Sequence, residues 1–253
     1  MQEKLIYNFL LYAVFISALF VFLALWFIKA PYGRHYRKGW GLFTRARLGW
    51  IVMESPTVIL MAFLFIIGNK SDNLVAIIFL AIWMSHYLQR AFVYPVLMKG
   101  GQKRFPLMVI AFALIFNLIN TYINGRYLFY FAPDYGLDWL TSSRFVIGLL
   151  VFLLGLAINI HSDSILRELR KNNEQGYSIP HRGFFKYVSS PNYLGEIMEW
   201  IGWAILTWSL PGLAFAVFTI ANLFPRAFSN HRWYRNNFED YPEHRKAIIP
   251  FIL

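Results

Sequence analysis

Polar side chains that could bind a polar ligand recur at helical spacing in three otherwise apolar stretches of the sequence. They follow one another at steps of three or four residues, which places each set on one face of a helix. The three stripes are Asn159, Asp163, Arg167 and Arg170; Asn192, Glu196 and Glu199; and Arg226, Asn230 and Tyr234. Ser190 and Pro191 precede the second stripe as an N-cap and a first-turn proline, so the free N–H groups of that turn suit a phosphate. The pattern predicts a binding site, and hydrogen bonding between helices is the alternative.

Composition indicates which elements must position these side chains. Of the 253 residues, 58% are hydrophobic and 15% are charged, whereas soluble domains have about 45–50% apolar and about 25% charged residues. A multi-pass protein of the lipid bilayer is expected, and a nucleic acid partner is not, despite the net charge of +11. The absence of cysteine excludes disulfides, thiolate metal sites and a cysteine nucleophile.

Seven segments are long and apolar enough to cross a bilayer as helices, which takes about 20 residues each. The expected spans are residues 5–28, 50–68, 73–97, 105–124, 144–166, 191–208 and 211–228. The fold class is therefore all-α, with one seven-helix domain over residues 1–253. The loops are too short for a βαβ nucleotide-binding unit of about 30 residues, so any cofactor must bind in the bundle and its cytoplasmic loops.

The basic residues predict the orientation of these spans. With seven spans, the segments 29–48, 98–105 and 167–190 and the tail from 226 onward share one side and hold 19 of the 24 lysines and arginines. Only four lie on the other side. Because basic residues concentrate on the cytoplasmic side, the N-terminus is expected outside and the C-terminus in the cytoplasm.

This orientation gives a depth for each polar side chain, at 1.5 Å of helix per residue. From the cytoplasmic ends of their spans, Glu196 and Glu54 lie about 7 and 9 Å deep, Arg90 and Glu199 about 12 Å, and Tyr87 about 16 Å. Ionisable groups at such depths are costly and usually functional. A transporter is expected to gather them nearer the midplane. The pattern favours a cavity open to the cytoplasm over a lipid-binding or transport bundle.

Several kinds of chemistry find no motif in the sequence. The six histidines form no HxxH, HxxHH or HExxH pattern, which argues against a di-iron or zinc site. No GxSxG elbow supports a serine hydrolase. Neither the Rossmann nor the P-loop fingerprint is present. We therefore expect no metal ion in the site.

Three long stretches resemble the steroid 5-alpha-reductase family: NIHSDSILRELRK (159–171), YVSSPNYLGEIMEWIGWAILTWSLPGLAFA (187–216) and FEDYPEHRKAIIPFIL (238–253). The resemblance continues upstream through MESPT (53–57) and HYLQRAFVY (86–94). This family uses NADPH to reduce the carbon–carbon double bond of 3-oxo-Δ4 steroids on a seven-helix membrane fold. The resemblance implies the same fold, cofactor and steroid substrate class for this chain.

The resemblance also implies roles for individual residues. Glu54 and Tyr87 match the pair that contacts the steroid 3-keto oxygen. The positions that match dinucleotide contacts are Asn159, Asp163, Arg170, Tyr177, Asn192, Glu196, Arg226 and Tyr234. The chain departs from the family at Ser178, where a basic residue is frequent, and at Asn230, where histidine is frequent. The basic loop 99–104 is also longer than in the animal enzymes.

These roles fit the chemistry of an α,β-unsaturated ketone. The ketone accepts hydride at its β-carbon when its carbonyl group is polarised, and a donor aimed at the oxygen stabilises the developing enolate. Tyr87 is the expected donor. A carboxyl group in an apolar bundle resists ionisation, so Glu54 can itself be protonated and donate. Glu196 or Asn192 could orient the nicotinamide carboxamide.

Two alternatives follow from the SPNYLGE segment (190–196), which is also similar to membrane methyltransferases such as isoprenylcysteine carboxyl methyltransferase. Those enzymes use S-adenosylmethionine and do not need the stripe that begins at Asn159. Enoyl-CoA and sterol reductases share the segment too, so another lipid enone is a possible substrate. The lack of cysteine and of a targeting sequence favours a bacterial member in the inner membrane, with the endoplasmic reticulum membrane as the eukaryotic counterpart.

Overall fold

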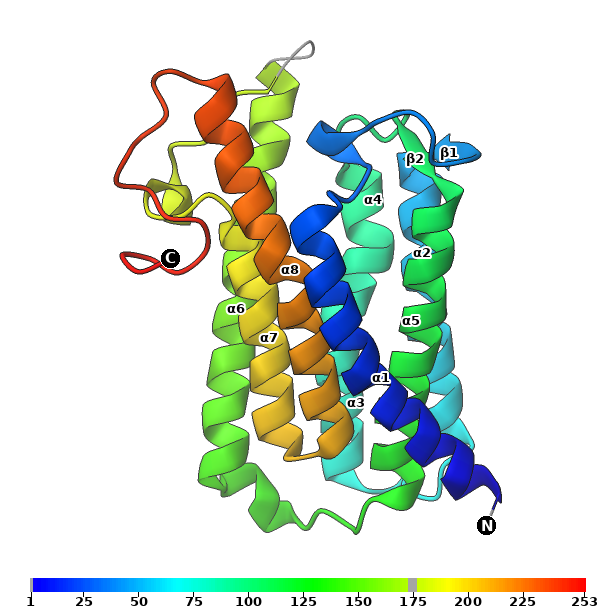
Figure 1. Cartoon of the computed structure of the whole chain (residues 1–253). Helices are drawn as coiled ribbons and strands as arrows, with labels where there is room; N and C mark the ends of the chain where they lie inside the picture. Colours follow the sequence, from blue (N-terminus) through cyan, green and yellow to red (C-terminus); the bar gives the residue numbers. More distant parts are fainter. Residues whose placement is uncertain (1, 173–176) are drawn as a thin grey trace. The chain divides into compact units, whose positions relative to one another are not determined.

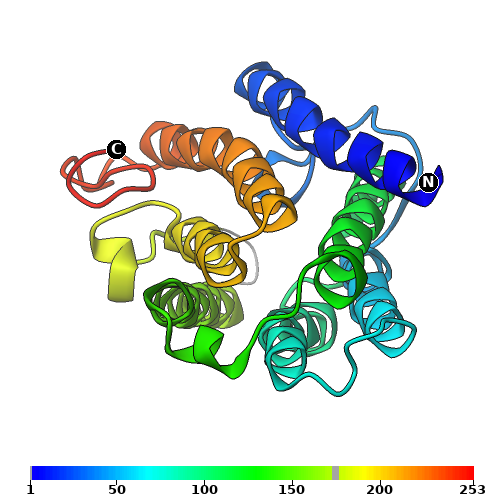
Figure 2. The same ribbon diagram turned by 90° about the horizontal axis from the view of Figure 1, so that it is seen from below.

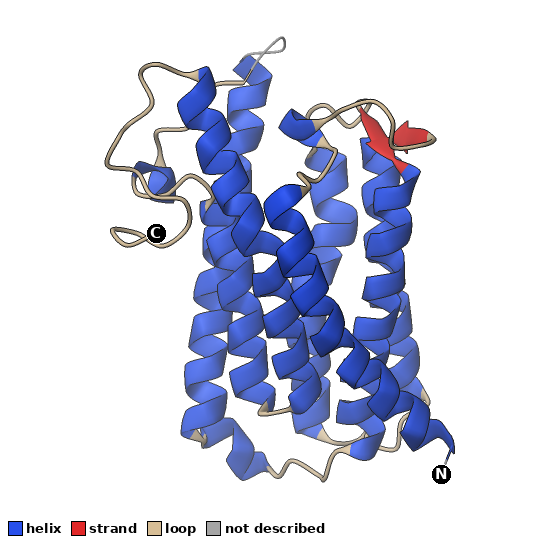
Figure 3. Ribbon diagram, viewed as in Figure 1, coloured by secondary structure: helices blue, strands red, loops and turns tan. Residues whose placement is uncertain are grey.

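A computed structural model of the chain describes residues 2–172 and 177–253, and it consists mostly of helices (Figures 1 and 3). The long helices in these residues are α1 (Gln2–Phe27), α2 (Ala46–Ile66), α3 (Leu74–Leu88), α5 (Leu107–Arg126), α6 (Ser143–Asn172), α7 (Pro191–Thr207) and α8 (Leu210–Asn237). The short turns are α4 (Tyr94–Leu97), π-helical η2 (Gln89–Val93) and η3 (Tyr127–Phe131), and 3-10 turns η1 (Gly33–His35), η4 (Leu137–Thr141) and η5 (Gly183–Lys186).

Each of the seven segments that the sequence marks as apolar spans is helical over most of its length. Six helical stretches in the described residues are long and apolar enough to cross a membrane: Gln2–Phe27, Ala46–Ile66, Leu74–Leu97, Leu107–Phe131, Ser143–Arg170 and Leu210–Asn237. The seventh expected span, α7, has 17 residues and is not among these six. Large apolar side chains stay exposed along these helices, as Leu5, Phe9 and Phe20 do on α1. Such surfaces need lipid around them, and the chain is a multi-pass membrane protein.

Two helices extend beyond their expected ends. α6 continues from the predicted end at residue 166 to Asn172, and α8 continues from 228 to Asn237. Hydropathy marks where the apolar residues stop, whereas a helix continues through good helix formers such as Arg, Leu and Glu. The polar stripes therefore lie on continuous helices.

The prediction of an all-α fold misses one small element. Strand β1 (Phe43–Arg45) pairs antiparallel with β2 (Arg104–Pro106), and Thr44 lies opposite Phe105 (red in Figure 3). The guanidinium group of Arg104 lies 4.5 Å from the centre of the Phe43 ring. Strands of three residues leave no alternating pattern long enough to read from the sequence.

The chain divides into two compact units. The first unit comprises Met1–Val14 and Pro31–Val146, and the second comprises Phe15–Ala30 and Ile147–Leu253, so the division falls within α1. In the second unit, α6, α7 and α8 adjoin one another in both side and end views (Figures 1 and 2). Trp208, in the left-handed region at φ 44°, and Ser209 make the tight turn that joins α7 to α8.

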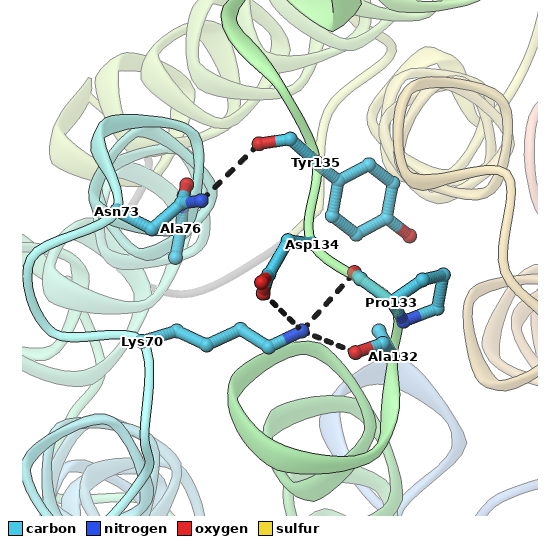
Figure 4. A network of polar contacts seen from close by, with 7 residues as sticks. All are labelled: Lys70, Asn73, Ala76, Ala132, Pro133, Asp134 and Tyr135. Atoms are coloured by element: carbon cyan, nitrogen blue, oxygen red, sulfur yellow. Dashed lines mark hydrogen bonds and ion pairs between the residues drawn. The ribbon is translucent and has the colours of Figure 1, made fainter.

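A buried lysine ties two loops of the first unit together (Figure 4). Lys70, in the loop between α2 and α3, donates to the backbone carbonyl groups of Ala132 and Pro133 and lies 3.3 Å from a carboxylate oxygen of Asp134. In the same loop, Asn73 caps the first turn of α3, because its side chain accepts a bond from a backbone N–H. These contacts hold the connection between α2 and α3 against the segment that follows α5.

A glycine seam joins α6 to α7 in the second unit. A Cβ atom on Gly155 would lie 2.5 Å from the carbonyl oxygen of Gly195, and one on Gly202 would lie 2.5 Å from the backbone nitrogen of Phe152. No side chain fits at such distances, so these glycines let the two backbones touch, as small residues do between membrane helices. This approach brings the polar residues at the next turns into hydrogen-bonding range.

Candidate functional site

A polar bridge joins α6 to α7 one turn beyond the glycine seam. Asn159 Nδ2 donates to the backbone oxygen of Asn192 at 3.0 Å, and Asn192 Nδ2 donates to Asp163 Oδ1 at 3.2 Å. Asn159 is 2% exposed and Asp163 is 4% exposed. The first and second stripes of the sequence therefore face one another, and three of the predicted cofactor residues form one connected group.

The N-terminus of α7 begins at Pro191, with Ser190 at the N-cap position. The sequence places this cap correctly, but the Ser190 hydroxyl makes no capping bond to the helix. Instead, Ser190 Oγ accepts a hydrogen bond from Asn230 Nδ2 of α8 at 3.2 Å. The first-turn N–H groups next to Asn192 are thus not capped by that hydroxyl.

Side chains of the third stripe, Arg226, Asn230 and Tyr234, contact the segments that lie next to α8. Arg226 Nη2 donates to the Tyr193 hydroxyl oxygen at 3.1 Å, and the same guanidinium lies 5.1 Å from the centre of the Tyr193 ring. Tyr234 is 2% exposed and stacks on Tyr241 of the tail, with ring centres 5.2 Å apart and planes 7° apart. Arg226 and Tyr234 therefore contact the start of α7 and the C-terminal tail, respectively.

The hydroxyl group of Ser189, which the sequence analysis did not identify, connects this tail to the helices through several hydrogen bonds. Ser189 Oγ lies 2.6 Å from both His231 Nδ1 and the Tyr241 hydroxyl oxygen, and it donates to the backbone oxygen of Lys246 at 3.0 Å. One hydroxyl has one proton, so Nδ1 of His231 and the Tyr241 hydroxyl must act as donors to Ser189. Burial raises the pKa of Tyr241 above its ordinary value. These residues share no sequence spacing that could have revealed them.

The remaining cofactor candidates also lie in the second unit. Glu196 is partly buried on α7, one turn after Asn192, and Arg170 is partly buried near the end of α6. The Tyr177 ring packs edge-on against Trp233 of α8, with centres 5.2 Å apart. All eight residues predicted to contact the dinucleotide are therefore in one unit.

The two residues predicted to contact the ketone lie in the first unit. Glu54, on α2, is partly buried, and its Oε2 accepts a bond from Asn117 Nδ2 of α5 at 3.2 Å. Tyr87, near the end of α3, is 3% exposed, and its ring lies 4.8 Å from that of Trp83. α2 and α3 pack against each other in this unit. The π-helical turn Gln89–Val93 begins two residues after Tyr87, and such turns are frequent at functional sites.

Arg90 has an aromatic environment in that π-helical turn. Its guanidinium lies 4.5 Å from the centre of the Trp50 ring and 4.8 Å from that of Tyr94. Cation–π contacts stabilise a cation in an apolar bundle.

The described residues offer no site for a metal ion. Among residues 2–172 and 177–253, no group of three or more His, Asp or Glu side chains could hold one.

Comparison with known proteins identifies the family. Residues 103–253 match the family model described as 3-oxo-5-alpha-steroid 4-dehydrogenase. The steroid 5-alpha-reductase DET2 of Solanum lycopersicum is 43% identical over 255 residues, which cover 99% of this chain and 98% of that protein. The 3-oxo-5-alpha-steroid 4-dehydrogenase 1 of Mus musculus is 41% identical over 255 residues, or 100% and 99% of the two chains.

A human relative aligns over a shorter length. The 3-oxo-5-alpha-steroid 4-dehydrogenase 1 of Homo sapiens is 44% identical over 227 residues, which cover 89% of this chain and 87% of that protein. The resemblance seen in the sequence motifs is thus confirmed over most of the chain. The protein belongs to the steroid 5-alpha-reductase family, and is an oxidoreductase of the 3-oxo-5-alpha-steroid 4-dehydrogenase type.

Proposed function

We propose that this protein uses NADPH to reduce the carbon–carbon double bond of a 3-oxo-Δ4 steroid, giving the 5-alpha-reduced 3-oxo steroid. Membership of the family supports the reaction type. The observation that carries the choice of cofactor is that Asn159 and Asp163, which belong to the stripe that a methyltransferase would not need, are hydrogen-bonded to Asn192 at the start of α7. A reductase of another lipid enone is the second candidate, because the enoyl-CoA and sterol reductases share the segment around Asn192.

The second unit has the side chains that a dinucleotide requires. Nη1 of Arg167 is buried and has no hydrogen-bond partner in the described part of the chain. Arg170 lies three residues further along the same face. A buried guanidinium nitrogen calls for an anion, and phosphate groups match the geometry of arginine. The residues that would hold NADPH are Asn159, Asp163, Arg170, Tyr177, Asn192, Glu196, Arg226 and Tyr234. NADPH supplies the hydride when it is bound.

In this proposal, the first unit polarises the ketone. The Tyr87 hydroxyl donates to the 3-keto oxygen, and the Glu54 carboxyl group shares this interaction. As hydride reaches the β-carbon, negative charge develops on the oxygen, and donors in a low-dielectric site stabilise it more strongly than water does. The steroid is a flat apolar ligand, which phenylalanine, tryptophan and leucine side chains can surround.

We also propose seven spans in one domain over residues 1–253, with the N-terminus outside and the C-terminus in the cytoplasm. α7 has 17 residues, and 17 is the lower end of the range for a transmembrane helix. The 19-to-4 distribution of basic residues supports the orientation. The membrane itself, the bacterial inner membrane or the endoplasmic reticulum, stays a prediction.

The absence of cysteine offers a direct test of topology. Single cysteines at the exposed positions Ser71 and Asp138 should react with an impermeant maleimide added outside sealed cells. Cysteines at the exposed positions Lys99 and Glu239 should react only after the membrane is opened. The cysteine-free protein is the control. If Ser71→Cys did not react with the maleimide in sealed cells, the orientation would be the reverse of the one proposed. The depths estimated for the polar side chains would then be wrong.

Replacement of Arg170 tests the choice of cofactor. Arg170→Ala should weaken NADPH binding by about 10- to 100-fold, because a hydrogen bond to a charged group contributes about 1.5–3 kcal/mol. NADH, which lacks the 2′-phosphate, should be affected much less, as titration of both cofactors would measure. Arg182→Ala is the matched control, since Arg182 is exposed and pairs with Glu168. If Arg170→Ala weakened the binding of NADPH and NADH by the same factor, Arg170 would not contact the 2′-phosphate.

A further inference from the structure

Asn117 of α5 makes an unusual pair of contacts with α2. Its side-chain nitrogen donates to the backbone oxygen of Met53 at 2.7 Å and to Glu54 Oε2 at 3.2 Å. Asn117 is 7% exposed. One buried amide therefore holds both the backbone and the carboxyl group of the residue proposed to contact the ketone.

A proline lies in α2 beside these acceptors. Pro56 is inside the helix and lacks the N–H group that would otherwise bond to the carbonyl oxygen of Val52, one turn earlier. Side chains also hydrogen-bond to carbonyl groups of this turn: Asn117 donates to the Met53 oxygen, and the Thr57 hydroxyl donates to the Glu54 oxygen at 2.5 Å. The backbone around Glu54 thus depends on side chains as well as on the helix.

The contact with Met53 also determines which end of the amide faces Glu54. A backbone oxygen can only accept, so the nitrogen of the amide must point toward Met53, and the amide cannot be flipped. The same nitrogen donates to Oε2 of the carboxyl group. Oε2 of Glu54 is therefore an acceptor for Asn117, and a carboxyl proton belongs on Oε1.

We infer that Asn117 is a positioning residue, which orients the Glu54 carboxyl group so that Oε1 carries the proton offered to the substrate oxygen. This inference rests on the proposed function of Glu54. Asn117 does not contact the ketone itself, and its effect passes through the carboxyl group. A misplacement of a catalytic group by about 1 Å can reduce a rate by about 10²-fold.

A double-mutant cycle tests this coupling. The variants are Asn117→Leu, Glu54→Leu and the two combined, and the rate is that of single-turnover NADPH oxidation with a 3-oxo-Δ4 steroid at saturation. Rates are expressed per NADPH-binding site, so unfolded protein does not count. Asn117→Leu should reduce the rate by about 10²-fold, with NADPH affinity unchanged. In the Glu54→Leu background, the same replacement should have no further effect.

The controls separate this inference from the proposed function. Asn124→Leu removes another buried amide of α5, one that bonds to Asn120, and should lower thermal stability without changing the rate. If Asn117→Leu does not fold, Asn117→Ala removes the donor without adding volume and replaces it in the cycle. If Asn117→Leu reduced the rate by the same factor in the wild-type and Glu54→Leu backgrounds, the positioning role would be overturned. A Glu54→Leu protein that turns over within twofold of wild type would instead overturn the proposed role of Glu54.

Discussion

Tyr87→Phe should reduce the rate of hydride transfer by about 10²–10³-fold, as expected for the loss of one donor to a developing oxyanion. The change removes a single hydroxyl group. The ring of Tyr87 should still pack on Trp83, and the fold should survive. NADPH affinity should not change, because the predicted cofactor residues belong to the second unit. The measurement is single-turnover NADPH absorbance with saturating cofactor and a 3-oxo-Δ4 steroid.

Tyr130→Phe is the matched control for this experiment. Tyr130 lies in the first unit and is 44% exposed, with the Arg126 guanidinium over its ring, so loss of its hydroxyl should leave the rate unchanged. If Tyr87 only joined helices, Tyr87→Phe would lower thermal stability and leave turnover intact. A Tyr87→Phe protein that binds NADPH normally and turns over within about twofold of wild type would exclude Tyr87 as the donor.

Exchanging the partners of the polar bridge in two steps should first weaken and then restore cofactor binding. Asn192→Asp places a second carboxylate against Asp163, in a contact that is now 3.2 Å long. Asn159 still donates to the backbone of residue 192, but the two like charges repel in a buried position. We expect the Kd for NADPH to rise by about 10²-fold, which corresponds to about 2.7 kcal/mol.

The double variant Asp163→Asn with Asn192→Asp restores one amide-to-carboxylate hydrogen bond in the reverse direction. Its Kd for NADPH should recover by at least about tenfold relative to Asn192→Asp, as isothermal titration would measure. Asn237→Asp is the control, because Asn237 is exposed at the end of α8 and its side chain donates locally, to the backbone oxygen of Trp233. A double variant no better than Asn192→Asp would contradict the bridge as the feature on which cofactor binding depends.

The helices and much of the second unit's polar group were predictable because they depend on local pattern. Apolar segments of sufficient length form helices wherever they lie in a bilayer, since each must satisfy its own backbone hydrogen bonds. Steps of three and four residues put Asn159 and Asp163 on one face before any contact is known. The three-residue strands β1 and β2 escaped prediction because their pairing joins residues about 60 positions apart, as Thr44 and Phe105 are.

By itself, the sequence determined the family, the helical segments and the residues able to carry the chemistry, because these follow from motifs and from periodicity within one helix. Only the tertiary structure decided which side chains meet. In the tertiary structure Glu54 is hydrogen-bonded to the amide of Asn117, and Arg226 to the hydroxyl of Tyr193. Ser189 is hydrogen-bonded to His231 of α8. Such contacts depend on how closely two helices approach and on their rotation about their axes. Those quantities are set by packing, as at the seam of Gly155 and Gly195, and no spacing along one chain records them.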